Sequence, residues 1–279
     1  MRAGFSAFPC FFKYHWLING KSNVDWEYRV DPFDRMASAE VADRLLITSL
    51  DDLQIEENPF AEGFLWNVHR GRYHGHPVAV KKLKQARSLA PLKKEVETWR
   101  RLTHPNILPL LGYTELPLPP MIVMELMDGS LFDLLHNRAV SLSLLRRVEI
   151  AFELASAVSY LHEKQFLHRD IRSFNVLVRG NDVMLADVIG VAVLDCLEII
   201  PNTPIRWAAP ELFSSKDAFS QFSDVYAMGI TLSEILTRER PYPQPWSVRD
   251  ISRAITTGSR PQIWPPTAGM QELLIAEKD

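Results

Sequence analysis

The sequence predicts an α+β fold of two lobes, with a small β-rich N-terminal lobe that holds one helix and a larger, mostly helical C-terminal lobe. Two observations predict this division. Between residues 64 and 126, short apolar stretches bounded by turn residues dominate, which is typical of strands. After Gly129, long amphipathic stretches follow one another, which is typical of helices. We expect the lobes to meet at a linker near residues 125–129.

The N-terminal lobe is expected to contain four strands and one helix. Residues 77–83 read PVAVKKL, and the run Val-Ala-Val fits a strand that is buried on both faces. A turn at His-Gly-His precedes it and joins it to the strand before. In PLKKEVETWRRL, apolar residues recur every three or four positions, as on one face of a helix. The expected elements are strands 64–70, 77–83, 106–113 and 120–126 and a helix over 91–102.

The C-terminal lobe is expected to contain a series of helices. The stretch FSDVYAMGITLSEILTR is apolar nearly all round, which predicts a buried helix. Gly258 suits the end of the last predicted helix, because glycine tolerates the left-handed conformation that often follows one. The expected helices cover residues 130–137, 143–164, 222–238 and 247–258.

Composition excludes several classes of protein. The 279 residues carry a net charge of −3, which argues against a nucleic-acid-binding protein. No stretch approaches the roughly 20 apolar residues that a membrane-spanning helix needs. Cys10 and Cys196 are the only cysteines, so we expect no disulfide framework and a reducing, cytoplasmic compartment.

One loop has the pattern that phosphoryl transfer requires. His168-Arg169-Asp170 is followed by Asn175, five residues after the aspartate. This chemistry needs a carboxylate close to the incoming hydroxyl and an oxygen ligand for Mg²⁺, and the spacing puts both on one loop. The alternative is a chance tripeptide on a turn between a helix and a strand.

Two charged residues elsewhere fit the same chemistry. Lys81 ends the buried Val-Ala-Val strand, where a cation is costly unless phosphates or a carboxylate neutralise it. Glu95 is the favoured partner, since Glu97 points about 200° away around the helix. Asp224 stands at the head of the buried helix and can accept backbone hydrogen bonds from the catalytic loop. The alternative for Asp224 is helix N-capping, in which Ser223 competes.

Together with PIRWAAPE at residues 204–211, these stretches resemble a eukaryotic protein kinase domain over about residues 53–260. The stretches HPNIL, GSLFDLLH and HRDIRSFNVLV resemble the tyrosine-kinase-like group of that family. The resemblance implies a kinase domain over residues 53–279, with an N-lobe at 53–125 and a C-lobe at 129–279. A partly disordered extension at residues 1–52 is expected to precede it.

The resemblance implies ATP and Mg²⁺ as cofactors, a protein as the substrate, and a role for each matching residue. Lys81 would hold the ATP phosphates and pair with Glu95, and Asp170 would act as the base. Arg172 would meet the transferring phosphate, which favours Ser or Thr over Tyr as acceptor, although Trp207 resembles a tyrosine-kinase feature. The implied metal ligands are Asn175 and Asp187, and the implied nucleotide contacts are Gly63, Val68, Ala79, Lys81, Met124, Glu125, Met127 and Leu177.

The chain departs from the family pattern in the glycine-rich loop and after the metal-binding aspartate. Only Gly63 remains of three glycines, and Trp66 replaces the last, so we expect weaker nucleotide binding. Asp187 is followed by Val188 and Ile189 in place of Phe-Gly, which predicts an altered path of the loop. We expect the large Trp99 to compensate in volume for the small Val188.

Further departures lie towards the C-terminus. No arginine follows Arg260, so Glu211 lacks its family partner and must be solvated or paired elsewhere. We expect the final helices of the family to be missing, and a partner protein to cover the exposed face of the C-lobe. Thr203 is the one hydroxyl residue between Asp187 and Glu211, so switching by phosphorylation is not expected. The alternative function is that of a pseudokinase, a binding or allosteric module with weak or no nucleotide binding.

Overall fold

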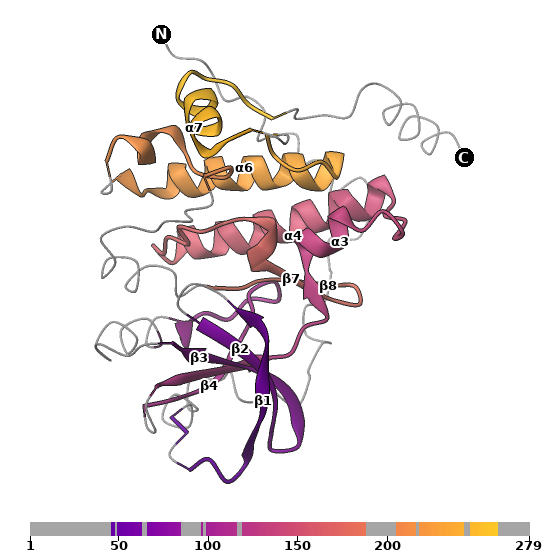
Figure 1. Ribbon diagram of the computed structural model, residues 1–279, viewed down its shortest axis with the longest axis vertical. Helices are drawn as coiled ribbons and strands as arrows, with labels where there is room; N and C mark the ends of the chain where they lie inside the picture. The colour runs from indigo at the N-terminus through magenta and orange to yellow at the C-terminus, as the bar shows by residue number, and fades with distance from the viewer. Residues whose placement is uncertain are drawn as a thin grey trace. The chain divides into compact units, whose positions relative to one another are not determined.

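The computed structural model describes residues 46, 47, 49–62, 66–84, 96, 99–115, 119–187, 205–215, 218–242 and 246–261 (Figure 1). Most of the predicted extension, residues 1–45 and Thr48, lies outside the described residues. So do Gly63, Glu95 and the stretch from Val188 to Pro204.

Within the described residues, five strands form an antiparallel sheet in the order β1-β2-β3-β5-β4. The strands are β1 (Leu53–Glu62), β2 (Trp66–Tyr73), β3 (His76–Leu83), β4 (Leu110–Thr114) and β5 (Met121–Glu125). The predicted strands are confirmed, although β4 begins four residues later than the sequence suggested, because Ile107 pairs with Leu185 instead. The pattern of β1 gave no prediction, since most of its side chains are exposed and its register shifts around Pro59.

The hairpin between β2 and β3 explains the predicted turn. His74 and Gly75 have φ angles of 49° and 81°, the left-handed pair that a two-residue hairpin turn requires. In β2, a Cβ atom on Gly71 would lie 2.5 Å from the backbone oxygen of Gln54. Glycine at this position therefore allows the backbone of β1 to approach its partner strand β2 closely.

Trp99 anchors the N-lobe helix to the chain that leads into β4. Trp99 is 2% exposed, and its indole nitrogen donates a hydrogen bond of 2.8 Å to the backbone oxygen of Leu108. Val96, one helical turn earlier, is also buried. Leu102, the last residue of the predicted apolar face, is partly buried against the same core, whereas Leu92 lies outside the described residues.

Serine begins each α-helix whose ends the structure describes. The helices are α3 (Leu131–His136), α4 (Leu144–Glu163), α6 (Gln221–Thr237) and α7 (Val248–Thr256). Their N-caps are Ser130, Ser143, Ser220 and Ser247, whose side chains accept from backbone amides of the first turn. The predicted helices are confirmed to within two residues, and α4 and α6 pack alongside one another (Figure 1).

A small second sheet of β6 (Gly129–Ser130), β7 (Val176–Arg179) and β8 (Asp182–Leu185) was not predicted. Backbone hydrogen bonds connect it with the segment before β4: Leu108 donates to Leu185 at 2.9 Å, and Leu185 donates to Asn106 at 2.8 Å. One apolar core extends from Ala79 through the helices to Ile235. The predicted α+β class, a β-rich N-lobe with a helical C-lobe, is confirmed. Among the described helices, none has the length and hydropathy to cross a membrane.

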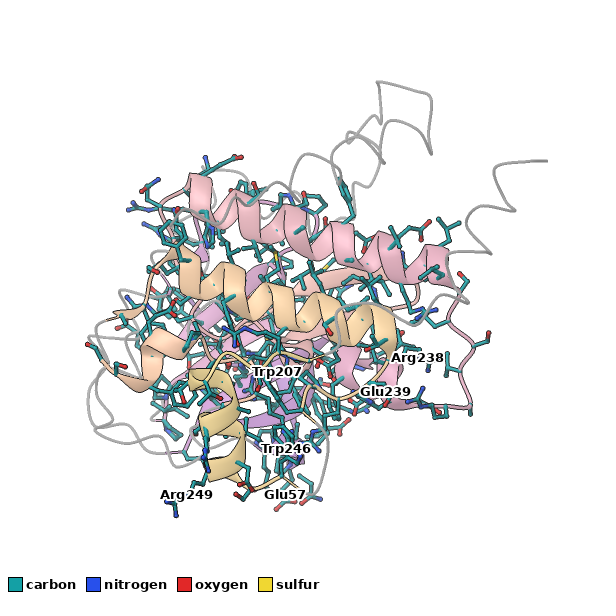
Figure 2. All side chains as sticks on the ribbon, turned by 90° about the horizontal axis from the view of Figure 1, so that it is seen from above. Glu57, Trp207, Arg238, Glu239, Trp246 and Arg249 are labelled. Atoms are coloured by element: carbon teal, nitrogen blue, oxygen red, sulfur yellow. The ribbon has the colours of Figure 1, made fainter. Side chains whose placement is uncertain are left out.

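Arg238 joins the end of α6 to the end of α3. It terminates α6 in the left-handed conformation, with φ at 56°, and Figure 2 labels it there. Its guanidinium donates to carbonyl oxygens of Leu134, Leu135, Asn137 and Val140 at 3.4, 2.9, 2.8 and 2.9 Å. The last carbonyls of a helix lack partners within it. The side chain of Arg238 therefore caps α3.

We predict that Trp99→Leu lowers the free energy of unfolding by about 2–4 kcal/mol, because a buried hydrogen bond and several buried atoms are lost. Thermal unfolding measures this. Trp246→Leu is the matched control, since Trp246 is 38% exposed and surface changes stay within about 0.5 kcal/mol. Equal shifts in the two variants would contradict the anchoring role.

Candidate active site

The buried carboxylate of Asp224 holds the start of the catalytic loop. It accepts backbone hydrogen bonds of 2.8 Å from both His168 and Arg169, and His162 Nε2 lies 3.0 Å from the same carboxylate. Ser220 caps α6 with Ser223 at the third position, so the helix does not need Asp224 as its cap. The predicted contact with the loop is thus confirmed, and N-capping by Asp224 is not.

This contact stabilises an uncommon backbone conformation. Arg169 has a φ of 65°, which costs a non-glycine residue of order 1 kcal/mol or more. Two charge-assisted hydrogen bonds to a carboxylate that is 1% exposed offset that cost.

Asp170 lies between an amide and a guanidinium. The side-chain nitrogen of Asn175 donates to its carboxylate at 2.7 Å and to its backbone oxygen at 2.8 Å. Arg172 Nε lies 3.0 Å from the other carboxylate oxygen. Burial raises the pKa of Asp170 above its ordinary value, although Arg172 and Asn175 oppose that shift. A carboxylate with a raised pKa is better suited to accept a proton.

The loop is tied to the segment that carries Asp187. His168 Nε2 lies 2.9 Å from the backbone oxygen of Ala186, and the amide of Ala186 donates to the backbone oxygen of Asn175 at 2.7 Å. Asp187 follows Ala186 with a φ of 61°. The predicted altered path after it, and the packing of Val188 against Trp99, fall outside the described residues.

Lys81 of β3 forms an ion pair with Asp187. Burial alone would raise the pKa of Asp187, but the charge and hydrogen bond of Lys81 outweigh it and hold that pKa below its ordinary value. The ring centre of Trp66 lies 6.0 Å from Lys81 Nζ, so this residue sits beside the lysine. The pairing of Lys81 with Glu95 stays a prediction, because Glu95 lies outside the described residues.

The predicted nucleotide contacts that are described lie on neighbouring strands or belong to the same apolar core. Val68 stands opposite Lys81 in the pairing of β2 with β3, and Ala79 stands opposite Met124 in the pairing of β3 with β5. One apolar cluster joins the predicted side chains Val68, Ala79, Met124, Met127 and Leu177. These surroundings suit a flat apolar group such as a purine base.

Glu125 has a partner that the sequence did not suggest. This residue ends β5, and its carboxylate pairs with Arg179 at the end of β7. Asp182 lies 3.6 Å from the same guanidinium. No fixed spacing relates Arg179 to the catalytic motifs, so only the three-dimensional arrangement reveals a link between the predicted linker and the second sheet.

The described donor groups fit a magnesium ion that is shared with phosphates. The amide nitrogen of Asn175 is committed to Asp170, so its amide oxygen is the atom left for a metal. With the carboxylate of Asp187 this makes an all-oxygen set, which Mg²⁺ prefers. In the described part of the chain, no three His, Cys, Asp or Glu side chains cluster as a metal site by themselves. Mg²⁺ usually takes one or two carboxylates and completes its shell with water and phosphate.

The sequence profile of protein tyrosine and serine/threonine kinases matches residues 55–274. The chain belongs to the protein kinase family. Its similarity to other kinases covers the same region. The probable serine/threonine-protein kinase pats1 of Dictyostelium discoideum is 32% identical over 251 residues, which is 81% of this chain and 8% of pats1.

Two further kinases show the same level of similarity. Serine/threonine-protein kinase STY46 of Arabidopsis thaliana is 30% identical over 73% of this chain and 36% of STY46. Dual specificity protein kinase shkC of Dictyostelium discoideum is 35% identical over 68% of this chain and 41% of shkC. The matched region therefore spans less than half the length of these relatives. As a family, protein kinases use ATP and a divalent metal.

Glu211, the glutamate of the Ala-Pro-Glu stretch of this kinase domain, is exposed to solvent in η5 (Pro210–Phe213). Solvation is one of the two outcomes that the sequence allowed for it. It avoids the cost of a buried, unpaired carboxylate. Thr203, the single hydroxyl residue between Asp187 and Glu211, lies outside the described residues.

We predict that Asp224→Asn lowers the free energy of unfolding by about 3–5 kcal/mol. The asparagine side chain carries no charge, and its NH2 group would face one of the two backbone N–H groups that now donate to the carboxylate. Chemical denaturation measures the loss. Glu239→Gln breaks the exposed pair with Arg138, at 2.7 Å, and is the matched control with an expected loss below about 1 kcal/mol. A loss in Asp224→Asn no larger than in this control would show that the loop does not depend on Asp224.

Proposed function

We propose that the chain is an ATP-dependent protein kinase that phosphorylates Ser or Thr side chains. One observation carries the proposal: Asp170 and Asn175 are hydrogen-bonded to each other, and Ala186 joins them to the Lys81–Asp187 pair. A base and an amide from one loop, the carboxylate of Asp187 and the cation of β3 thus converge, and these are the groups that phosphoryl transfer needs.

In the proposed reaction, Asp170 accepts the proton of the acceptor hydroxyl. The hydroxyl oxygen forms a bond to the γ-phosphorus of ATP, and the bond from that phosphorus to the bridging oxygen breaks, so that ADP leaves. Asn175 orients Asp170 through its amide nitrogen. Arg172, beside the base, can offer its charge to the phosphoryl group during transfer.

The nucleotide would bind over the apolar cluster around Ala79 and Leu177, with its phosphates at Lys81. Asn175 and Asp187 would hold Mg²⁺, which neutralises charge on the phosphates. Lys81 must then exchange its contact with Asp187 for contacts with phosphate. Gly63 and Glu95 keep their predicted roles as part of this proposal.

Two features favour Ser or Thr acceptors in an unidentified protein substrate. Arg172 stands two residues after the base and contacts it. The relatives are described as Ser/Thr kinases or, for shkC, as a dual specificity kinase, which keeps Tyr as a secondary acceptor. We place the reaction in the cytoplasm, since only two cysteines suit a reducing compartment. We also propose a role in intracellular signalling.

A second candidate is a pseudokinase, and one observation favours it. Lys81 pairs directly with Asp187, and Arg172 pairs with Asp170, so that protein groups already neutralise the charges of the site. A site that keeps these pairs would not take up ATP. Nucleotide binding therefore distinguishes the two candidates.

We predict that millimolar ATP with Mg²⁺ raises the melting temperature by a few degrees, since a ligand at about tenfold its Kd stabilises by ~1.4 kcal/mol. Lys81→Ala should lose the shift. Lys84→Ala, a nearby lysine paired with Glu62 at 3.6 Å, is the matched control and should retain it. An unchanged melting temperature in the wild-type protein would refute the kinase and favour the pseudokinase.

Phosphate transfer tests the proposal itself. Mass spectrometry of a peptide library with Ser, Thr and Tyr acceptors should show products with the wild-type protein and at least about 100-fold less with Asp170→Asn. The same variant should bind ATP. Equal transfer by both proteins would exclude Asp170 as the base.

We predict opposite pH effects from the two aspartates. The pKa of Asp170 is raised in the folded protein, so folding favours its protonated form. The wild-type protein therefore loses stability as the pH rises through that pKa, because Asp170 ionises. Asp170→Asn cannot ionise and should become more stable than wild type over the same pH range. Since the pKa of Asp187 is lowered, its ionised form stabilises the fold above the unfolded pKa, and Asp187→Asn should destabilise at neutral pH. Melting temperatures of both variants and of wild type, measured against pH, test both effects. If both variants shifted the melting temperature in the same direction at neutral pH, the opposite pKa changes of the two aspartates would be contradicted.

A further inference from the structure

Beside Asp170 lies a group of aromatic side chains that the proposed chemistry does not use. Phe174 of η4 (Ser173–Asn175) stacks on Phe132 of α3, with ring centres 3.9 Å apart and planes at 17°. Trp207 approaches Phe174 edge-on at 6.1 Å. We refer to Phe132, Phe174 and Trp207 as the aromatic ledge. It adjoins the base, because Asn175, the residue after Phe174, donates to Asp170.

The ledge combines exposure with support. Phe174 is 37% exposed, whereas Trp207 is 4% exposed and closes one end. On the other side, the ring of His136 lies 4.4 Å from Phe132, and His136 is held by the fully buried Glu234 at 2.9 Å. A large aromatic that is exposed yet fixed in position offers a contact surface at low entropic cost.

Guanidinium groups surround the ledge. Arg172 lies 5.6 Å from the ring centre of Phe174, and Arg240 lies 5.8 Å from that of Phe132. Arg206, buried nearby, donates to the backbone oxygens of Pro241 and Tyr242. Burial, and then the charge of Arg240, lower the pKa of Arg206, which shows that these two cations lie within electrostatic range.

The positive charge at Arg240 is not neutralised within the described part of the chain. Its neighbour Glu239 pairs with Arg138 at 2.7 Å, and Glu234 pairs with His136. Arg240 itself is exposed and has no described carboxylate partner. The indole nitrogen of Trp207 is buried without an acceptor among the described residues, which adds a donor dipole of the same sign. An apolar platform beside one uncompensated cation, Arg240, is complementary to an acidic peptide.

We propose that the aromatic ledge and Arg240 form a peptide subsite that selects substrates with Asp or Glu close to the phosphorylated residue. The peptide's apolar atoms pack on Phe174, and its carboxylate pairs with Arg240. A lysine or arginine at the same position of the peptide meets like charge and is disfavoured. This inference rests on the proposed kinase function for its peptide ligand, but its binding step is independent of turnover.

Peptide binding to the full chain tests the inference without catalysis. Two fluorescent peptides share one Ser, and Glu residues beside it in the first are Lys residues in the second. Fluorescence anisotropy should show about tenfold tighter binding of the acidic peptide to the wild-type protein. Arg240→Glu should abolish or reverse the preference. Tighter or equal binding of the basic peptide to the wild-type protein would overturn the inference.

Two further variants separate the ledge from general charge effects. Arg249→Glu makes the same charge change on α7, where Figure 2 shows Arg249 extending outward, and should keep the preference. Phe174→Leu keeps an apolar side chain but removes the stacked ring, and should weaken binding of the acidic peptide several-fold while its melting temperature shows that it is folded. A preference that Arg249→Glu alters as much as Arg240→Glu would refute a local subsite.

Phosphate transfer to the same two peptides distinguishes this inference from the proposed function. Transfer to both peptides at equal kcat/KM would overturn the subsite and leave the kinase intact. Preferential binding of the acidic peptide without transfer to either would support the subsite and refute the kinase. Preferential transfer to the acidic peptide, lost in Arg240→Glu, would support both.

Discussion

The active-site geometry depends on one buried carboxylate at the head of α6. Asp224 accepts the backbone amides of His168 and Arg169 and thereby fixes a left-handed residue at the start of the loop. Through this contact α6 fixes the start of the loop that carries Asp170. Ser220 and Ser223 cap the helix by bonding to backbone amides at its start, so the carboxylate of Asp224 can accept hydrogen bonds from the loop instead. The position of Asp170, the proposed base, therefore depends on the folded core as well as on Asn175 and Arg172 of the loop itself.

The two aspartates of the site have the same intrinsic chemistry, but their surroundings shift their pKa values in opposite directions. Desolvation dominates at Asp170 and raises its pKa, whereas the charge of Lys81 prevails at Asp187 and lowers its pKa. The first is thereby suited to take a proton and the second to remain a ligand. Divergent environments for like groups are a general sign of divided roles in catalysis.

Much of this arrangement could be predicted from the sequence, and the reasons for the remainder are physical. The helices followed from apolar periodicity and from Gly258, and the contact of Asp224 with the loop followed from its place at the head of a buried helix. Neither β1 nor the pair of Glu125 with Arg179 was predicted, because exposed strands have weak patterns and ion pairs between distant segments leave no spacing signal. The stacking of Phe174 on Phe132 was missed for the same reason, since α3 and η4 lie apart in the chain.

The capping of α3 by Arg238 has a consequence for the order of folding. A helix of six residues does not persist alone in water. Here its terminal carbonyls accept hydrogen bonds from Arg238, which lies more than 100 residues later in the chain. The capped form of α3 therefore requires α6 to be in place. Phe132 belongs to α3, so the surface beside Asp170 also depends on the contacts that Arg238 provides. Slow closure of such long-range contacts makes this corner of the domain the part most dependent on the whole chain being present.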